Sequence, residues 1–180
     1  MHAIKKLADG SNVLIAEFYY ATYRTEYYTT TVNGVAQTLT RQVFDGYQYT
    51  QALVASFDAE GKKLWDNIFE MNLSQKPYYA RKFIRTSIDG NTINCLFANL
   101  NTIKSISFEN GAVVKERSTE KIKENTETEK LKSAGGTDAT YWYDNNFIIT
   151  GYQKIVDKEA EKGKRRRRVF FMEKVGLKNE

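Results

Sequence analysis

The stretch that decides the fold is ALVASFDAEGKKLWDN, residues 52–67, in which a short polar turn joins two apolar runs. The first run ends at Phe57, the second contains Trp65, and Asp58 and Gly61 lie between them. Asp favours turns because its carboxylate bonds nearby backbone N–H groups, and Gly accepts the positive φ that a tight turn requires. We therefore predict a hairpin here, with Trp65 packed between neighbouring sheets. Stacking of Trp65 on a ligand is the alternative.

Two weaker copies of the surrounding pattern follow along the chain. Each copy starts with an Asn and continues into an apolar strand: NVLIAEFY at 12–19, NTINCLFA at 91–98 and NFIITGYQ at 146–153. A shorter strand-like run precedes each of these segments, and a third strand that closes at a Gly follows it. The first two copies then add a fourth strand, KKLWDNIF at 62–69 and AVVKERST at 112–119. The pattern predicts repeated antiparallel meanders.

Turn dipeptides punctuate runs rich in Val, Ile, Thr, Tyr and Phe, which is typical of hairpins. They are Asp9-Gly10, Asn33-Gly34, Asp45-Gly46, Asp89-Gly90 and Asn110-Gly111. We predict one all-β domain over 1–180, with units at about 1–74, 75–132 and 133–180. Its expected architecture is a partial β-propeller of about three four-stranded blades, with a β-sandwich or barrel as the alternative. Because the third unit has only three strands, we expect the chain to be the C-terminal part of a longer protein.

The repeat resembles the blades of quinoprotein-type β-propellers, which carry an Ala, an Asp, a turn Gly and then a Trp. Here these are Ala55, Asp58, Gly61 and Trp65, whereas Glu60 replaces the Thr that normally precedes the turn Gly. Quinone binding is therefore not implied. The wider pattern, FDGYQYTQALVASFD at 44–58 and NNFIITGYQKI at 145–155 followed by RRVFFMEKV at 167–175, is similar to propeller-like proteins of the Bacteroidetes cell envelope. That resemblance implies a secreted or cell-envelope location and supplies no catalytic residues.

Most site chemistries lack their residues. The only His is His2, at a terminus expected to fray, so Ser-His-Asp, Cys-His and zinc centres are not expected. Cys95 has no cysteine to pair with and is predicted to be a buried apolar residue. No run approaches the roughly 18 apolar residues of a membrane span. We expect no metal, no cofactor and no membrane span.

The candidate carboxylates do not form an obvious catalytic pair. Most of them lie in or beside turns, where Asp serves local hydrogen bonding. They are Asp58, Asp66, Glu70, Asp89 and Asp144. A glycosidase needs two carboxyl groups opposed across a cleft, and no pair here shows that arrangement. We predict no catalytic residues and a protein that is not an enzyme.

A tyrosine-rich insertion at 19–50 is the first candidate binding region. Asn33-Gly34 divides it into two arms that can pair as a long hairpin. Its candidate ligand-binding residues, for a glycan or a protein, are Tyr19, Tyr23, Tyr27, Tyr47 and Tyr49. The alternative is that these rings pair across the strands and cover the sheet.

The excess positive charge lies at the C-terminal end. Residues 154–180 hold ten Lys or Arg and five Asp or Glu, so the remaining residues hold seventeen of each out of totals of 27 and 22. The excess centres on KGKRRRR, 162–168, with candidate polyanion-binding residues Lys164, Arg165, Arg166, Arg167 and Arg168. Nucleic acid, acidic glycan and anionic lipid are the possible ligands. Alternate arginines of a strand project to opposite faces, and the alternative is a hairpin arm balanced by the acidic run at 157–161.

A second charged run, KERSTEKIKENTETEKLK at 115–132, is predicted to be a solvated loop, a hairpin tip or a frayed helix. The sequence as a whole favours a non-enzymatic, propeller-like binding or scaffold module. Its expected partners are a protein or glycan ligand and the missing N-terminal part of the parent chain. The alternatives are polyanion binding through 162–168 and an accessory part of a carbohydrate-active enzyme.

Overall fold

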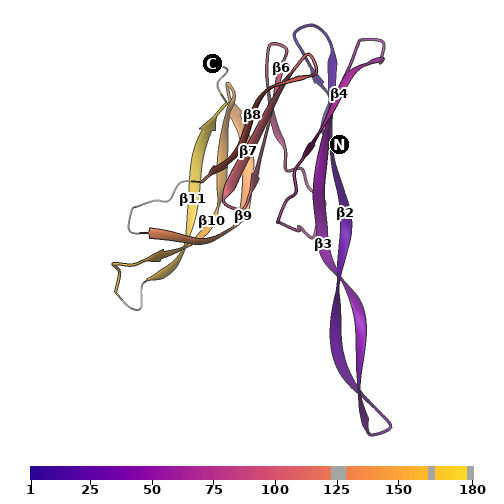
Figure 1. The fold of residues 1–180 in the computed structure, drawn as a ribbon, viewed down its shortest axis with the longest axis vertical. Coiled ribbons are helices and arrows are strands. Elements are labelled where there is room, and N and C mark those ends of the chain that lie inside the picture. The colour runs from indigo at the N-terminus through magenta and orange to yellow at the C-terminus, as the bar shows by residue number, and fades with distance from the viewer. Residues whose placement is uncertain (123–128, 162–164, 178–180) are drawn as a thin grey trace.

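The first sheet is a four-stranded antiparallel meander. In the computed structural model, which describes residues 1–122, 129–161 and 165–177, sheet A has the order β1-β2-β3-β4. Its strands are β1 (Lys5–Lys6), β2 (Asn12–Val32), β3 (Val35–Phe57) and β4 (Lys63–Glu70). The outer halves of β2 and β3 project from the body as a long two-stranded arm (Figure 1). The predicted hairpin at Asn33-Gly34 is the tip of this arm, and both residues have positive φ.

The second and third sheets repeat the meander. Sheet B has the order β5-β6-β7-β8, with β5 (Arg85–Asp89), β6 (Thr92–Asn99), β7 (Thr102–Glu109) and β8 (Ala112–Lys121). Sheet C has the order β11-β10-β9, with β9 (Glu129–Tyr143), β10 (Asn146–Asp157) and β11 (Arg166–Gly176). The prediction of an all-β chain built from repeated antiparallel meanders is confirmed, and none of the three sheets is closed. The described part of the chain contains no helix.

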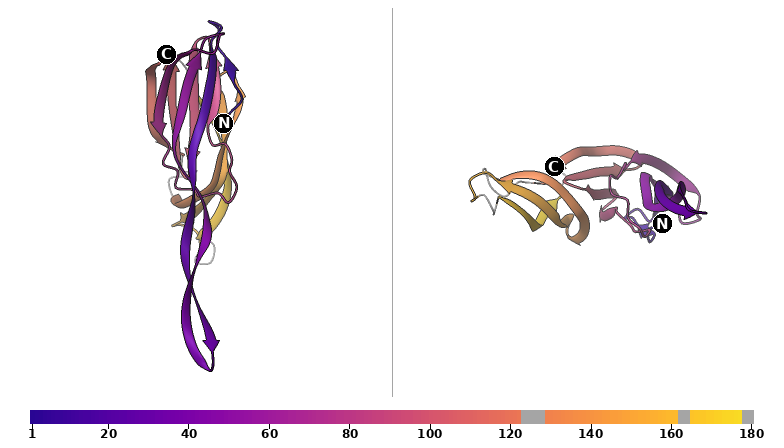
Figure 2. Two further views of the ribbon diagram at one scale, coloured as in Figure 1. Left: turned by 90° about the vertical axis from the view of Figure 1, so that its right-hand side faces the viewer. Right: turned by 90° about the horizontal axis from the view of Figure 1, so that it is seen from below.

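The three sheets lie side by side in chain order, with sheet B in the middle (Figure 2). Two hydrophobic cores separate them, because successive side chains of β6 point to opposite faces. Ile93, Cys95 and Phe97 join the core that β2 and β3 also supply, whereas Leu96 and Ala98 join the core shared with sheet C. This double role explains why seven of the eight residues of β6 are buried. Sheet B is therefore the layer that fixes the positions of the other two.

The turn that the sequence places at residues 58–61 joins β3 to β4. Asp58 Oδ1 accepts hydrogen bonds from the backbone N–H of Glu60 at 3.1 Å and of Lys62 at 2.7 Å, and Gly61 has φ +85°. Trp65 is half-buried at the junction of sheets A and B, where its ring stacks on Phe108 with centroids 6.4 Å apart. It packs between sheets as predicted.

One predicted turn is wrong. Asp45-Gly46 lies inside β3, where the register with β2 shifts between Thr22 and Tyr23, so the pair forms a β-bulge. Gly46 has φ +103°, and a Cβ there would lie 2.6 Å from the backbone oxygen of Lys76. The glycine is needed because the connection from β4 to β5 crosses β3 at this point.

The N-terminus does not fray as expected. The backbone N–H of His2 donates to the oxygen of Ile15 at 2.9 Å, and its Nε2 lies 2.6 Å from Glu17 Oε1. The carboxylate of Glu17 also accepts hydrogen bonds from the backbone N–H groups of Phe83 and Ile84, each at 3.0 Å. Glu17 thereby ties the first residues and the end of the β4–β5 connection to β2.

The charged run at 115–132 is largely strand, since β8 extends to Lys121 and β9 begins at Glu129. Ile122 is buried in the core between sheets B and C, which differs from the expected solvated run. The run thus holds an apolar anchor beside its charged residues, and its central part, 123–128, lies outside the described residues.

Candidate functional site

The tyrosines of the insertion divide into a cluster near the sheet and one isolated ring. Tyr19 contacts Tyr47 edge-on with centroids 5.3 Å apart, and it contacts Tyr49 at 4.9 Å. Tyr23 joins this cluster through Phe44 at 6.0 Å. Tyr27 lies further out on the arm, opposite Thr40, with 73% of its surface exposed. These contacts favour cross-strand pairing of the rings over a shared ligand platform.

Tyr49 is not an exposed ligand-binding residue, which corrects the expectation. It is fully buried, and its hydroxyl donates to the backbone oxygen of Arg81 at 2.7 Å and accepts from the N–H of Arg81 at 2.8 Å. Burial raises the pKa of this phenol. Tyr49 therefore holds the β4–β5 connection against β3.

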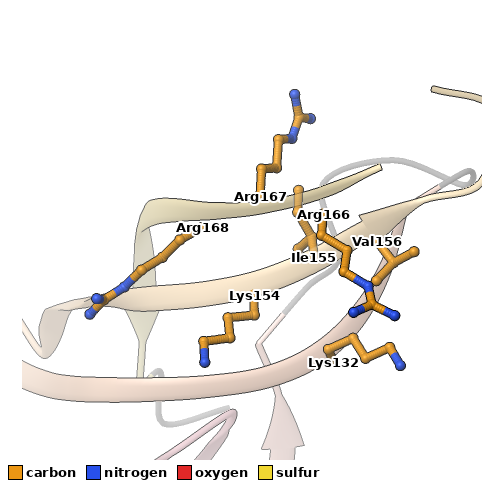
Figure 3. Close-up of a pocket in the computed structure, with 7 residues that line it drawn as sticks. All are labelled: Lys132, Lys154, Ile155, Val156, Arg166, Arg167 and Arg168. Carbon is orange, nitrogen blue, oxygen red and sulfur yellow. The ribbon is translucent and has the colours of Figure 1, made fainter. Parts of the chain in front are cut away.

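The basic hairpin places its arginines on both faces of sheet C. In the β10–β11 register, Lys154 pairs with Arg168, Ile155 with Arg167, and Val156 with Arg166. Paired residues share a face, so Lys154, Arg166 and Arg168 lie on one side and Arg167 lies on the other with the buried Ile155. Figure 3 shows these directions, with Lys132 from β9 on the same side as Lys154.

The two sides have different electrostatic roles. Arg167 is 55% exposed and forms an ion pair with Glu129, whose side chain is only 4% exposed. On the opposite side, the guanidinium of Arg168 lies 4.3 Å from the centre of the Tyr152 ring. Arg165 donates to the backbone oxygen of Ala160 at 3.1 Å, and Lys164 lies outside the described residues. Only part of the predicted basic run therefore faces one surface.

We call Lys132, Lys154, Arg166 and Arg168 the basic face. Together with Ile155, Val156 and Arg167, these residues line an open pocket of about 370 Å³ (Figure 3). Among the described residues, no carboxylate lines this pocket. Four cations thus surround a hollow with an apolar lining, and such an arrangement attracts anionic groups.

The sequence reasoning missed Lys132 and Lys154. Lys154 could have been found from strand alternation, since Tyr152 and Lys154 share a face of β10 and flank the buried Gln153. Lys132 could not, because the β9–β10 register shifts between Lys154 and Ile155 and this shift decides which β9 residue approaches the pocket. A β-bulge of that kind leaves little trace in a single sequence.

Metal binding and thiol chemistry can be assessed in the parts of the chain that the structure describes. No three His, Cys, Asp or Glu side chains there are grouped so that they could hold a metal ion. Cys95 is fully buried, and desolvation raises the pKa of its thiol to about 12. The thiol is therefore held in its neutral, unreactive form.

No protein-family model, curated protein or solved structure matches this chain. The resemblance to propeller repeats therefore stays a prediction. Within 1–122, 129–161 and 165–177, no helix is long and apolar enough to cross a membrane.

Proposed function

We propose that the protein is a non-enzymatic binding module whose three sheets are successive propeller-like blades, and that the basic face of sheet C binds polyanions. Support for the blade-like arrangement comes from the two cores, which pack sheet A on sheet B and sheet B on sheet C in chain order. The proposed ligand site lies on the side of sheet C whose side chains belong to neither core. An extended polyanion can therefore reach it along its whole length.

One observation carries the polyanion proposal. Lys132, Lys154, Arg166 and Arg168 come from three neighbouring strands and line one pocket to which no carboxylate of 1–122, 129–161 or 165–177 contributes. Like charges brought together without acids repel one another, so an unpaired cluster is costly unless an anion neutralises it. By contrast, several other surface cations are paired with carboxylates: Arg24 and Arg41 with Glu26, Lys63 with Asp66, and Lys76 with Asp45.

The ligand must be a polymer or an extended anion to use the whole basic face. Each Lys or Arg that meets an anionic group releases a condensed counterion, so affinity falls steeply with salt. The arginines add planar donors that bond phosphate, sulfate or carboxylate oxygens in pairs. The proposed function is therefore retention of a multivalent anion, without chemical change to it.

The test compares two triple variants that remove the same charge from different places. Lys154→Gln/Arg166→Gln/Arg168→Gln removes three of the four cations of the basic face, whereas Lys5→Gln/Lys6→Gln/Lys62→Gln removes three exposed lysines from β1 and the β3–β4 turn. We expect the first variant to bind heparin about tenfold or more weakly at low salt, since three anion contacts are lost, and the second to bind nearly as the wild type does. Fluorescence titration with labelled heparin measures both.

Equal losses in the two variants would show that net charge alone governs binding and would contradict the proposal. Absence of heparin binding by the wild-type protein at 50 mM salt would do the same. Circular dichroism of each variant checks that the strands are retained. Arg167 is left unchanged in both variants because it pairs with the buried Glu129.

A further inference from the structure

Along the exposed face of β11, the edge strand of sheet C, cationic side chains flank a central apolar pair. In β11 the residues that face away from the core are Arg166, Arg168, Phe170, Met172 and Lys174, because Phe171 between them is buried. At about 3.3 Å per residue, this row runs for roughly 26 Å. Glu173, the one carboxylate of the strand, lies on the opposite face by strand alternation. The exposed row is thus cationic at both ends and apolar in the middle.

The neighbouring strands add aromatic rings to the same face. Tyr152 of β10 is exposed and contacts Phe170 edge-on, with centroids 5.5 Å apart. At the far end, Lys174 Nζ lies 5.4 Å from the centre of the Trp142 ring of β9. Phe170 is 55% exposed and Trp142 is 53% exposed. We call Trp142, Tyr152 and Phe170 the aromatic row.

Such a face combines two kinds of recognition. Side chains of the basic face and Lys174 can contact anionic groups, while the aromatic row offers ring surfaces between them. Proteins that bind single-stranded nucleic acid without sequence preference use this combination, with phosphates on cations and bases stacked on aromatic rings. A sulfated glycan or an anionic lipid surface would use the cations but has no planar bases to stack on Phe170.

We infer that the outer face of sheet C binds single-stranded nucleic acid, with bases on the aromatic row and phosphates on the basic face. This inference rests on the proposed polyanion-binding function. Charge complementarity supports a nucleic acid, and the exposed rings on the same face support a single strand over a duplex. In a duplex the bases are already stacked on each other, so the rings of the aromatic row gain no contact. The site therefore distinguishes single strands from double strands by stacking.

The experiment measures binding of fluorescein-labelled dT12, a duplex of the same length and labelled heparin by anisotropy at fixed salt. The test variant is Tyr152→Ala/Phe170→Ala, which keeps every cation. The matched control is Tyr27→Ala/Tyr79→Ala, which removes two more exposed rings from other parts of the chain. Loss of one stacked base costs about tenfold in affinity or more.

We expect the test variant to bind dT12 at least about tenfold more weakly while its affinity for heparin changes less than about twofold. The control should bind both ligands as the wild type does, and the wild type should prefer dT12 to the duplex. If heparin binds but the test variant keeps its dT12 affinity, this inference is overturned and the proposed function stands. If the wild type binds neither ligand, both are overturned.

Discussion

Replacing Arg167 with Gln is expected to destabilise the fold, whereas replacing the adjacent Arg166 is not. Arg167 pairs with Glu129, which is buried near the start of β9, while Arg166 points to the other face and lines the open pocket. Both changes remove one positive charge from one strand. Only Arg167→Gln leaves a buried carboxylate without its cation, so the two variants separate the structural role of this hairpin from its proposed role in binding.

The magnitude follows from the exposure of the two partners. Breaking a fully buried ion pair costs about 3–5 kcal/mol, and a hydrogen bond to a charged group contributes about 1.5–3 kcal/mol. Because 55% of the Arg167 side chain is exposed, water partly replaces it, and we expect a loss of about 2 kcal/mol. For a chain of this size that corresponds to a fall in Tm of roughly 4–8 °C. Arg166→Gln should change stability by less than about 0.5 kcal/mol.

Urea unfolding followed by far-ultraviolet circular dichroism measures the free energy of unfolding of each variant. The double variant Glu129→Gln/Arg167→Gln is the decisive control, because a neutral amide at 129 no longer needs a cation. It should recover most of the stability that Arg167→Gln loses. The reasoning is refuted if Arg167→Gln is as stable as Arg166→Gln, or if the double variant is less stable than Arg167→Gln alone.

Three further changes test the packing. Gly46→Ala should destabilise the fold by at least about 2 kcal/mol in thermal unfolding, because the new Cβ would clash with the backbone of Lys76 and alanine disfavours the positive φ of this position. A variant as stable as the wild type would contradict the bulge. Trp65→Ala should cost about 2–3 kcal/mol, below the range for a fully buried ring, and a soluble variant of unchanged stability would show that the stack on Phe108 contributes nothing. Cys95 should resist iodoacetamide at pH 8 until the protein is unfolded, because the thiolate is the reactive form and the pKa of this thiol is raised to about 12. Fast labelling of the native protein would contradict the burial of Cys95.

The sequence was sufficient for the meanders because their signals are local. Asn33-Gly34, Asp89-Gly90 and Asn110-Gly111 all lie at hairpin turns, which need the positive φ found at the glycine of each pair and also at Asn33 and Asn110. Asp45-Gly46 carries the same local signal yet forms a bulge. A glycine is required there because the β4–β5 connection, which is distant in sequence, passes too close to leave room for a Cβ. Local propensity cannot separate those two cases.

The candidate site was less predictable because it depends on strand register and on which residues are covered by segments distant in sequence. Tyr49 resembles Tyr47 in the sequence, but the β4–β5 connection covers Tyr49 and bonds its hydroxyl through Arg81. Lys132 approaches the basic run only through the shifted register of β9 and β10. The tetra-arginine run was visible from composition, whereas the division of its roles between Arg167 and its neighbours required the location of Glu129.

The dependence of dT12 affinity on salt tests the central claim most directly. Each phosphate neutralised on a single strand contributes about −0.7 to the slope of log K against log salt concentration, so the four cations of the basic face predict a slope of roughly −3. Lys154→Gln/Arg166→Gln/Arg168→Gln should make the slope shallower by roughly 2, because three of these cations are lost. Equal slopes for the wild type and this variant would contradict polyanion binding at the basic face.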